Sequence, residues 1–361
     1  MTSLFWPGPD SGGDDRDEAK VAVEAMSKNS SKDTTLVSEL ATGLGMIRRT
    51  LPEAMEHIPS ELVGVPQPDW QTLQSLFTSR KHTRLFESSF ANGRAFAESD
   101  VALRHRQPRE VEWCGRRKLR GEGTIPADLR IDHVYLVSCK YDSKNILNSG
   151  PAKLFDNRLR DGRQSAVSWY EEVAPRSYQA YYSAVRTFYE LDGLPVSVGD
   201  LTSDQRGELT AVLPRLLPSG LQHEQSEFCA EVSEASAARW RRSIGHSPQD
   251  KTDFAMTLLR IPQAVYFLLG QGGSSPHRFK VLSRWDWANR FRLVDFAVSS
   301  STAMQPTVNW SIEVGDRLSG EKLTAKGHVE VRWSHGRFNK APEAKVYLDS
   351  PLGDTPGFIA L

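Results

Sequence analysis

The sequence predicts a mixed α/β fold of the α+β kind, because helix-like and strand-like segments occur in blocks along its 361 residues. Apolar residues recur at helical spacing before residue 107, and strand-like runs cluster between residues 110 and 141. Helical patterns return between residues 177 and 245, and the chain after residue 285 is mainly strand-like. We therefore expect a mixed β-sheet flanked by helices, with N-terminal helices and a β-rich C-terminal segment.

Composition indicates a soluble protein of a reducing compartment. The chain carries 45 basic and 45 acidic residues, and 39% of its residues are hydrophobic. Its three cysteines include no CxxC pair, which argues against a disulfide framework or a structural zinc site. No apolar run approaches the roughly 20 residues that span a bilayer, and the N-terminus lacks a signal-peptide pattern. We expect a cytoplasmic protein that does not bind membranes.

The N-terminal third begins with a polar segment and continues as helices. Residues 1–34 are rich in Ser, Asp, Gly and Lys, and we expect them to be mostly disordered. From residue 35, the run TLVSELATGLGMIRRTLPEAMEHI has helical spacing with a proline break. A second run, residues 68–106, predicts one or two further helices.

Three strand-like runs follow: EVEWCG, ADLRI and VYLVSCKY. If the turn between the last two is centred on His133, antiparallel pairing places Asp128 opposite Ser138. Lys140 then lies diagonally from Asp128 on the same polar face, while Val137 and Cys139 point to the other face. A carboxylate and an ammonium group could then contact the same phosphate.

The remaining chain predicts helices first and strands afterwards. Residues 143–162 begin as a polar loop and end in a short helix, and three helices follow over 177–193, 202–218 and 224–245. Tyr178, Tyr181, Val185 and Phe188 recur at helical spacing, which favours a core-facing stripe over a base-stacking surface. Strands are expected at AVYFLLG, RFKVLSRW, FRLVDFAVSS, TVNWSIEVG, GHVEVRWS and AKVYLDS.

The hairpin from Ile125 to Asn145 resembles the PD-(D/E)xK, restriction-endonuclease-like nuclease superfamily. The matching residues are PAD at Pro126–Asp128 and SCK at Ser138–Lys140. The resemblance implies a restriction-endonuclease-like core with a catalytic set of Asp128, Lys140, Glu98 and Ser138. It implies a Mg²⁺ site, with Mn²⁺ as the alternative, that uses Asp128, Glu98 on a preceding helix, and the carbonyl of Cys139. Lys140 would orient or activate the attacking water.

Ser138 departs from that pattern, because the family has an acid there. A hydroxyl is a weaker cation ligand than a carboxylate. The substitution leaves three interpretations open: weaker metal binding, an acid supplied from Glu98, Glu112 or Asp132, or loss of catalysis.

Basic charge flanks the hairpin. Residues 101–120 hold seven Arg or Lys against two acids, and residues 140–163 hold six against three. This pattern predicts a phosphate-binding groove, and a solvated charged surface is the alternative. The candidate nucleic-acid contacts are Arg116, Arg117, Lys118, Lys144, Asn145, Asn148 and Lys153. A C-terminal turn, Trp333 to Phe338, is either an exposed aromatic tip or a packed hairpin.

We expect a Mg²⁺-dependent endonuclease that hydrolyses DNA phosphodiester bonds, with restriction or anti-phage defence as its setting by analogy. Its expected partners are DNA and either a second copy of the chain or another defence protein. The alternatives are an inactive nuclease-like subunit of a defence or repair complex, and an interaction protein that uses its β-rich C-terminus. The expected organisation is residues 1–34, a lead-in plus core over 35–300, and a C-terminal segment over 301–361.

Overall fold

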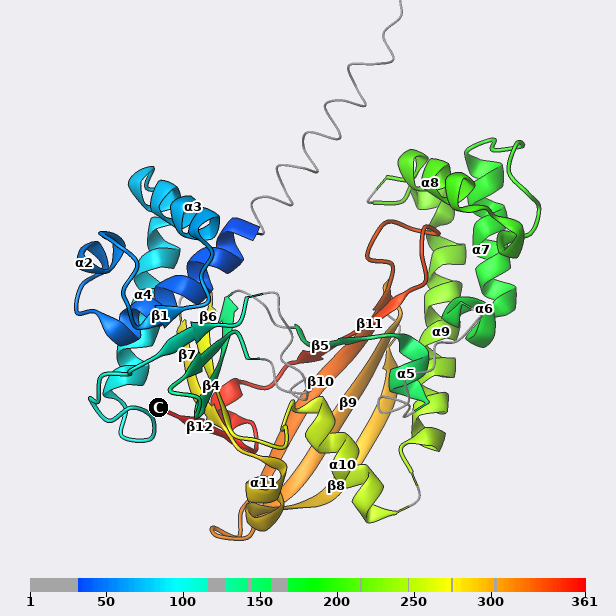
Figure 1. Cartoon of the computed structure of the whole chain (residues 1–361). Coiled ribbons are helices and arrows are strands. Elements are labelled where there is room, and N and C mark those ends of the chain that lie inside the picture. Colours follow the sequence, from blue (N-terminus) through cyan, green and yellow to red (C-terminus); the bar gives the residue numbers. More distant parts are fainter. Residues whose placement is uncertain are drawn as a thin grey trace, which may run out of the picture. The chain divides into compact units, whose positions relative to one another are not determined.

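The computed structural model describes residues 32–115, 127–141, 145–156, 168–214, 216–245, 247–273, 275–301 and 304–361 (Figure 1). They form two compact units. The first takes its residues from Met1–Asp142, Tyr266–Arg278 and Leu361. The second takes its residues from Ser143–Val265 and Phe279–Ala360. Residues 1–34, which the sequence predicts to be mostly disordered, lie outside the described part of the chain, apart from residues 32–34.

The first unit begins with helices. One covers residues 32–47 of the described chain, and it is followed by α2 (Leu51–Met55), α3 (Gln67–Thr78) and α4 (Thr83–Glu98). The first of these helices crosses α4 at very short range, because a Cβ atom on Gly45 would collide with the carbonyl of Phe90. A Cβ atom on Gly93 would likewise collide with the carbonyl of Thr42. Two glycines therefore fix where the N-terminal helix lies.

A mixed seven-stranded sheet follows the order β1-β2-β3-β4-β6-β7-β12. Its strands are β1 (Leu62–Val63), β2 (Val111–Trp113), β3 (Leu129–Ile131), β4 (Tyr135–Tyr141), β6 (Tyr266–Gly272), β7 (Ser275–Val281) and β12 (Phe358–Ala360). Pairs β1–β2 and β4–β6 are parallel, whereas β2–β3, β3–β4 and β7–β12 are antiparallel. The predicted fold class, a mixed sheet with flanking helices, is confirmed. Strand β7 runs across the boundary between the two units.

The register expected for the hairpin is confirmed. Leu129 pairs with Val137 and Ile131 pairs with Tyr135, so the turn is centred on His133. Leu129, Ile131 and Val137 are fully buried, which explains why this strand pairing is fixed. A shift of one residue would move these apolar side chains away from the core.

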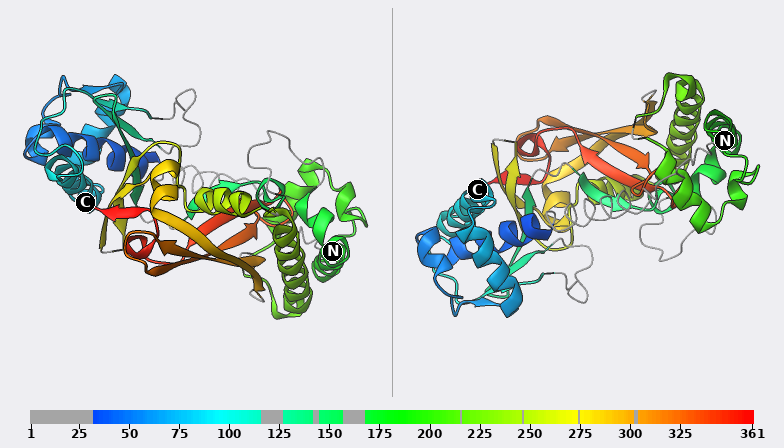
Figure 2. Two further views of the ribbon diagram at one scale, coloured as in Figure 1. Left: turned by 90° about the horizontal axis from the view of Figure 1, so that it is seen from below. Right: turned by 90° about the horizontal axis from the view of Figure 1, so that it is seen from above.

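The second unit contains a five-stranded antiparallel sheet in the order β5-β11-β10-β9-β8. The strands are β5 (Asn145–Ser149), β8 (Phe291–Ser301), β9 (Thr307–Asp316), β10 (Lys322–Arg332) and β11 (Glu343–Leu348). The long strands, orange to red, run side by side in both views of Figure 2. On β9, Val308, Trp310, Ile312 and Val314 are buried and alternate with more exposed residues, as expected of a sheet with one covered face.

Helices of the second unit pack on this sheet and on one another. They are α5 (Pro151–Phe155), α6 (Trp169–Val173), α7 (Pro175–Phe188), α8 (Ser203–Val212), α9 (Gln222–Ser243), α10 (Pro248–Leu258) and α11 (Arg284–Arg290). Three short 3₁₀ turns lie at Val198–Asp200, Ser219–Leu221 and Leu352–Asp354. Helix α9 contacts both β8 and β9, and its Phe228, Val232 and Trp240 side chains are buried.

Several local expectations need correction. Residues 145–149 form strand β5 rather than a loop, because they pair with β11, a partner almost 200 residues away. Phe188 is 47% exposed and does not continue the buried stripe of Tyr178, Tyr181 and Val185. It is the last residue of α7, where the helix ends. Phe338 is fully buried, so the C-terminal turn is packed rather than an exposed aromatic tip.

The boundary expected near residue 300 falls inside β8. The two compact units divide the chain after residues 142, 265, 278 and 360. Strand β8 pairs with β9 from Phe291 to Ser301, and this continuous ladder holds both sides of residue 300 in one unit. Among the described residues, no helix has the length and apolar character needed to cross a membrane.

Candidate functional site

Asp128 lies at the entrance to β3, where the hairpin register places it beside Ser138. Its Oδ2 atom accepts a 2.6 Å hydrogen bond from the backbone N–H of Cys139 and a 3.3 Å bond from the Ser138 hydroxyl. Its own backbone is held on both sides, since its N–H donates to Val137 and its carbonyl accepts from Cys114. The carboxylate is therefore fixed at the strand edge by two donors that stabilise its negative charge.

The N-terminal helix brings a second carboxylate to this position. Glu39 is buried, and its Oε2 atom accepts a 2.6 Å hydrogen bond from the indole N–H of Trp113 on β2. Burial is the larger and the negative charge of Asp128 the smaller of two effects that raise the pKa of Glu39, which comes to about 7. The Trp113 hydrogen bond and the positive charge of Lys140 act in the opposite direction. Glu39, Asp128 and Lys140 thus form one electrostatic cluster.

Lys140 is held in place through its neighbours on β4 and β6. It pairs with Gly270, whose missing side chain allows close approach to the Lys140 carbonyl. The Tyr141 hydroxyl accepts a 3.0 Å bond from the Asn92 amide, which also donates to the Gly270 carbonyl at 2.8 Å. Tyr141 also lies 3.3 Å from the Thr42 hydroxyl on the helix that carries Glu39. One network of hydrogen bonds therefore connects the elements that carry Glu39 and Lys140.

Cys139 contributes through its backbone and has an unreactive thiol. Burial raises the pKa of that thiol well above its usual range, and the charges of Asp128 and Glu39 add to the effect. A thiol that stays protonated is a poor nucleophile. The N–H of Cys139 orients Asp128, while the predicted role of its carbonyl as a metal ligand stays a prediction.

The acids considered from sequence lie in other surroundings. Glu98 ends α4 with its side chain 47% exposed and forms an ion pair with Arg94. Glu112 accepts a 2.7 Å hydrogen bond from Arg130 Nε on the neighbouring strand. Asp132 accepts hydrogen bonds from the backbone N–H groups of residues 109 and 110 and thereby stabilises the loop before β2. Among the described residues, the carboxyl group whose pKa responds to both Asp128 and Lys140 is that of Glu39, and sequence reasoning missed it.

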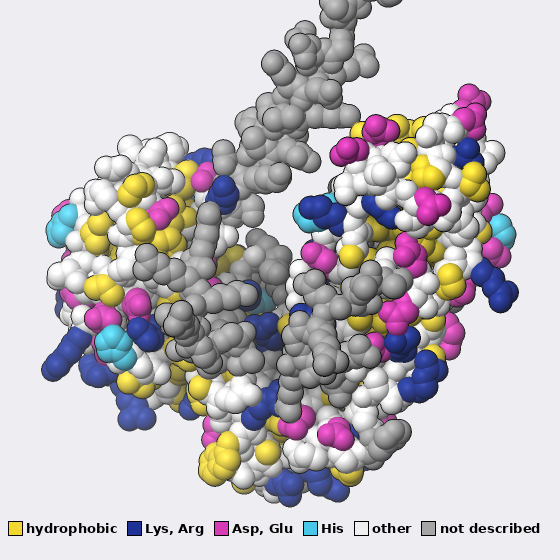
Figure 3. Space-filling view, turned by 45° about the vertical axis from the view of Figure 1, so that its right-hand side comes forward, with side chains coloured by type: hydrophobic (Ala, Val, Ile, Leu, Met, Phe, Trp, Pro, Cys, Tyr) yellow, Lys and Arg dark blue, Asp and Glu magenta, His cyan; other side chains and the backbone are white. Residues whose placement is uncertain are grey.

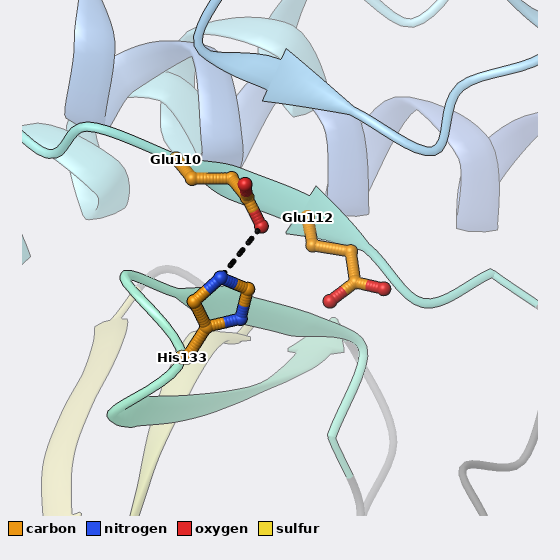
Figure 4. A group of neighbouring side chains, drawn as sticks. All are labelled: Glu110, Glu112 and His133. Carbon is orange, nitrogen blue, oxygen red and sulfur yellow. Dashed lines mark ion pairs between the residues drawn. The ribbon is translucent and has the colours of Figure 1, made fainter.

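A second group of potential ligands lies on the same sheet. Glu110, Glu112 and His133 each place one ligand atom within 4.8 Å of the others (Figure 4). Glu110 points at the imidazole of His133, with 3.4 Å between Oε1 and Nε2, and the His133 side chain is 63% exposed. Glu112 is paired with Arg130, and Glu110 faces His133. Each of the two carboxylates therefore already has a positive or ionisable partner within the protein.

The predicted nucleic-acid contacts are only partly described. Arg116, Arg117, Lys118 and Lys144 lie outside the described residues. Asn145 begins β5, and Asn148 on the same strand donates a 3.3 Å bond to Glu343. Lys153 lies in the last turn of α5. On the face drawn in Figure 3, basic side chains form several small groups with acidic side chains among them.

Comparison of the chain with protein-family models, with curated proteins and with solved structures found no match.

A signal for Glu39 was present in the sequence. It is the only charged residue between Thr34 and Ile47, a run that is otherwise apolar or small. A single acid within an apolar helix needs a partner or a function, because an unpaired buried carboxylate is costly. The signal did not show where in the fold the acid would lie, since Asp128 is 89 positions further along the chain.

Proposed function

We propose that this protein is a divalent-cation-dependent nuclease that hydrolyses DNA phosphodiester bonds at Glu39, Asp128 and Lys140. One observation carries the proposal: a buried acid with a raised pKa lies close enough to an aspartate and a lysine to respond to both charges. A carboxyl whose pKa is strongly perturbed by burial and by a specific charged partner is a candidate functional group, because such groups cluster at functional sites. The resemblance of the hairpin to PD-(D/E)xK nucleases supports the same chemistry.

The donor set fits a hard cation. Glu39 and Asp128 offer carboxylate oxygens, the ligand type that Mg²⁺ prefers. Burial and the charge of Asp128 disfavour a negative charge on Glu39, and Glu39 and Asp128 are the residues that would hold a cation, whose charge would offset that penalty. When bound, Mg²⁺ would stabilise negative charge on the phosphate and lower the pKa of a coordinated water.

The chain's own groups have separate tasks in this proposal. Asp128 is oriented by the Cys139 N–H and the Ser138 hydroxyl before substrate arrives. Lys140 supplies an ammonium group that orients the attacking water and offsets charge on the scissile phosphate. Trp113 fixes the rotamer of Glu39 and favours its charged form.

The test is cleavage of supercoiled plasmid DNA by the full chain with Mg²⁺, compared with Mn²⁺ and with EDTA. We expect Lys140→Ala and Asp128→Asn to lower the rate by about 10²–10⁴-fold, the usual effect of losing a positioned acid–base or electrostatic group. Lys81→Ala is the matched control, since Lys81 lies in the same unit and is exposed. Its rate should stay within twofold of the unaltered chain.

Two other outcomes would contradict the proposal. Salt-sensitive DNA binding without cleavage, unchanged by Lys140→Ala, would support the alternative of an inactive nuclease-like subunit. Ser138 in place of the family's acid is the observation that favours that alternative. Cleavage that persists in both Lys140→Ala and Asp128→Asn would show that the activity resides elsewhere.

A further inference from the structure

Helix α11 in the second unit carries two tryptophans with opposite surroundings. Trp287 is fully buried, and its indole N–H donates a 3.1 Å hydrogen bond to the carbonyl of Pro356. Trp285 is 73% exposed, and the other exposed residues of the helix are Ala288 and Asn289. These three lie at helical spacing on one face, and that face carries no acid. Among the described tryptophans, no other is exposed to this degree.

The backbone that presents Trp285 is fixed before any ligand binds. Ser283 caps the helix, because its hydroxyl accepts a 3.1 Å hydrogen bond from the N–H of Asp286 and donates to the carboxylate of the same residue at 2.6 Å. The N–H of Arg284 donates to the carbonyl of Pro262 at 2.8 Å. The residues on both sides of Trp285 are therefore anchored, which lowers the entropy cost of binding a ligand to this face.

Two exposed arginines lie where α11 leads into β8. Arg292 is the second residue of β8, and Arg317 directly follows β9. Arg292 pairs with Gly315, and the N–H of Arg317 donates to the carbonyl of Arg290 at 2.8 Å, so the two arginines are diagonal neighbours across one ladder. Strand alternation places both side chains on the same side of the ladder. Gly315 has no side chain that could separate or cover them.

The nearby acids do not neutralise these two arginines. Asp316 is buried, and Arg290 already pairs with it at 3.0 Å. Glu321 forms its hydrogen bonds within the turn after β9. Among the described residues, no acid forms an ion pair with Arg292 or Arg317. Like charges that are neighbours across a ladder repel each other, so an anion such as a phosphate diester would be favourable beside them.

We propose that a single strand of DNA binds the α11 surface, which consists of Trp285, Asn289, Arg292 and Arg317. The indole stacks on an unpaired base, the amide of Asn289 forms a hydrogen bond with a base edge, and the arginines contact phosphates. Five helical steps and two strand steps separate Trp285 from Arg292, so their Cα atoms lie within about 15 Å of each other. A few nucleotides of one strand cover that distance.

Two other occupants fit the α11 surface less well. A duplex keeps its bases stacked on one another and offers the indole no free base face. Clusters that bind anionic lipids contain about four to eight basic residues, whereas this surface has two arginines. The inference concerns the second unit and does not require cleavage. Only the choice of DNA over RNA rests on the proposed function.

The experiment is fluorescence anisotropy of a labelled oligothymidylate of about 12 nucleotides, titrated with the full chain in EDTA. EDTA prevents metal-dependent cleavage, so binding is measured whether or not the proposed nuclease activity exists. The single strand should bind more tightly than a duplex of the same length. Trp285→Ala should weaken its binding about tenfold, the usual effect of losing one stacked base, and Trp285→Phe should weaken it by no more than about threefold. Because Trp285 is exposed, Trp285→Ala should leave the unfolding temperature within about 2 °C.

Salt dependence tests the two arginines. Arg292→Gln combined with Arg317→Gln should reduce the slope of log K against log salt concentration by about 1.4, because each phosphate contact contributes about 0.7 for a single strand. Arg176→Gln combined with Arg242→Gln is the matched control. It removes two exposed arginines from α7 and α9 of the same unit, with the same change in net charge, and should leave the slope unchanged.

The proposal is overturned if the single strand does not bind, if the duplex or an RNA strand of matching sequence binds more tightly, or if the control pair lowers the slope as much as the Arg292 and Arg317 pair. Vesicles of phosphatidylcholine and phosphatidylserine provide a further arm. If Trp285→Ala abolished binding to these vesicles and left DNA binding unchanged, the α11 surface would be a membrane contact and the proposal would be wrong.

Discussion

The first unit contains two groups of acidic side chains, and they differ in how their charges are balanced. Glu110 and Glu112 lie close together with His133, yet Glu112 is paired with Arg130 and Glu110 faces the imidazole. Their side chains are 35% and 25% exposed. Glu39, by contrast, is 8% exposed, lies near Asp128 and has a pKa of about 7.

This difference shows that proximity of ligand atoms is a weaker guide to a cation site than unbalanced charge. Acids that are exposed and paired with arginine are stable as they stand. A buried acid beside a second acid lacks such compensation, and its negative charge lowers the stability of the folded protein. We infer that Glu39 is retained for function, whereas Glu112 stabilises the pairing of β2 with β3.

Activity gives the largest expected contrast between the two groups. Glu39→Gln should lower DNA cleavage by about 10²-fold or more, because it removes a cation ligand while preserving the shape of the side chain. Glu112→Gln should leave the rate within about threefold. Plasmid cleavage over a range of Mg²⁺ concentrations measures both. Equal losses in the two variants, or a larger loss for Glu112→Gln, would reverse the assignment.

Glu39→Gln and Glu112→Gln should change the free energy of unfolding in opposite directions at pH 8. Because the pKa of Glu39 rises from 4.5 in the unfolded chain to about 7 in the folded protein, the folded state binds more protons between these values. Stability therefore falls as pH rises through this window. In EDTA at pH 8, Glu39→Gln should increase the free energy of unfolding by about 1–3 kcal/mol, and near pH 4 the gain should vanish.

Glu112→Gln supplies the counterpart for stability. It should lower the free energy of unfolding at pH 8 by about 0.5–1 kcal/mol, since it weakens a partly exposed ion pair with Arg130. Urea unfolding at both pH values measures the two variants. A Glu39→Gln variant that is less stable than the unaltered chain at pH 8 would contradict the assignment of a raised pKa.

A smaller effect tests the link between Trp113 and Glu39. Trp113→Phe removes the indole N–H that lowers the pKa of Glu39, so that pKa should rise further. If cleavage requires the charged form, the rising limb of the pH–rate profile should move by about one unit to higher pH. The rate at pH 7 should fall about three- to tenfold and recover near pH 9. A loss that is the same at every pH would indicate a packing role alone.

Local pattern predicted the part of the site that lies in one stretch of sequence. Strand alternation and the turn at His133 placed Asp128 opposite Ser138, because register follows from the buried faces of Leu129 and Val137. The contribution of Glu39 could not be predicted in the same way. It depends on the helix crossing at Gly45, a contact between elements distant in sequence. Strand β5 was missed for the same reason, since its partner is β11.

The smallest expected effect concerns Ser138, the residue that departs from the nuclease motif. Ser138→Ala removes a 3.3 Å hydrogen bond to Asp128, but the 2.6 Å bond from Cys139 remains and keeps the carboxylate oriented. Cleavage should therefore fall by no more than about threefold, in line with the loss of one weak hydrogen bond. Ser138→Asp would instead place a third acid at a fully buried position, and it should lower the unfolding temperature in EDTA. Because a cation would neutralise part of that charge, added Mg²⁺ should restore some of the lost stability. If Ser138→Ala abolished cleavage while the fold was retained, Ser138 would have to act on the substrate directly, and Glu39 would not replace the acid that the motif lacks.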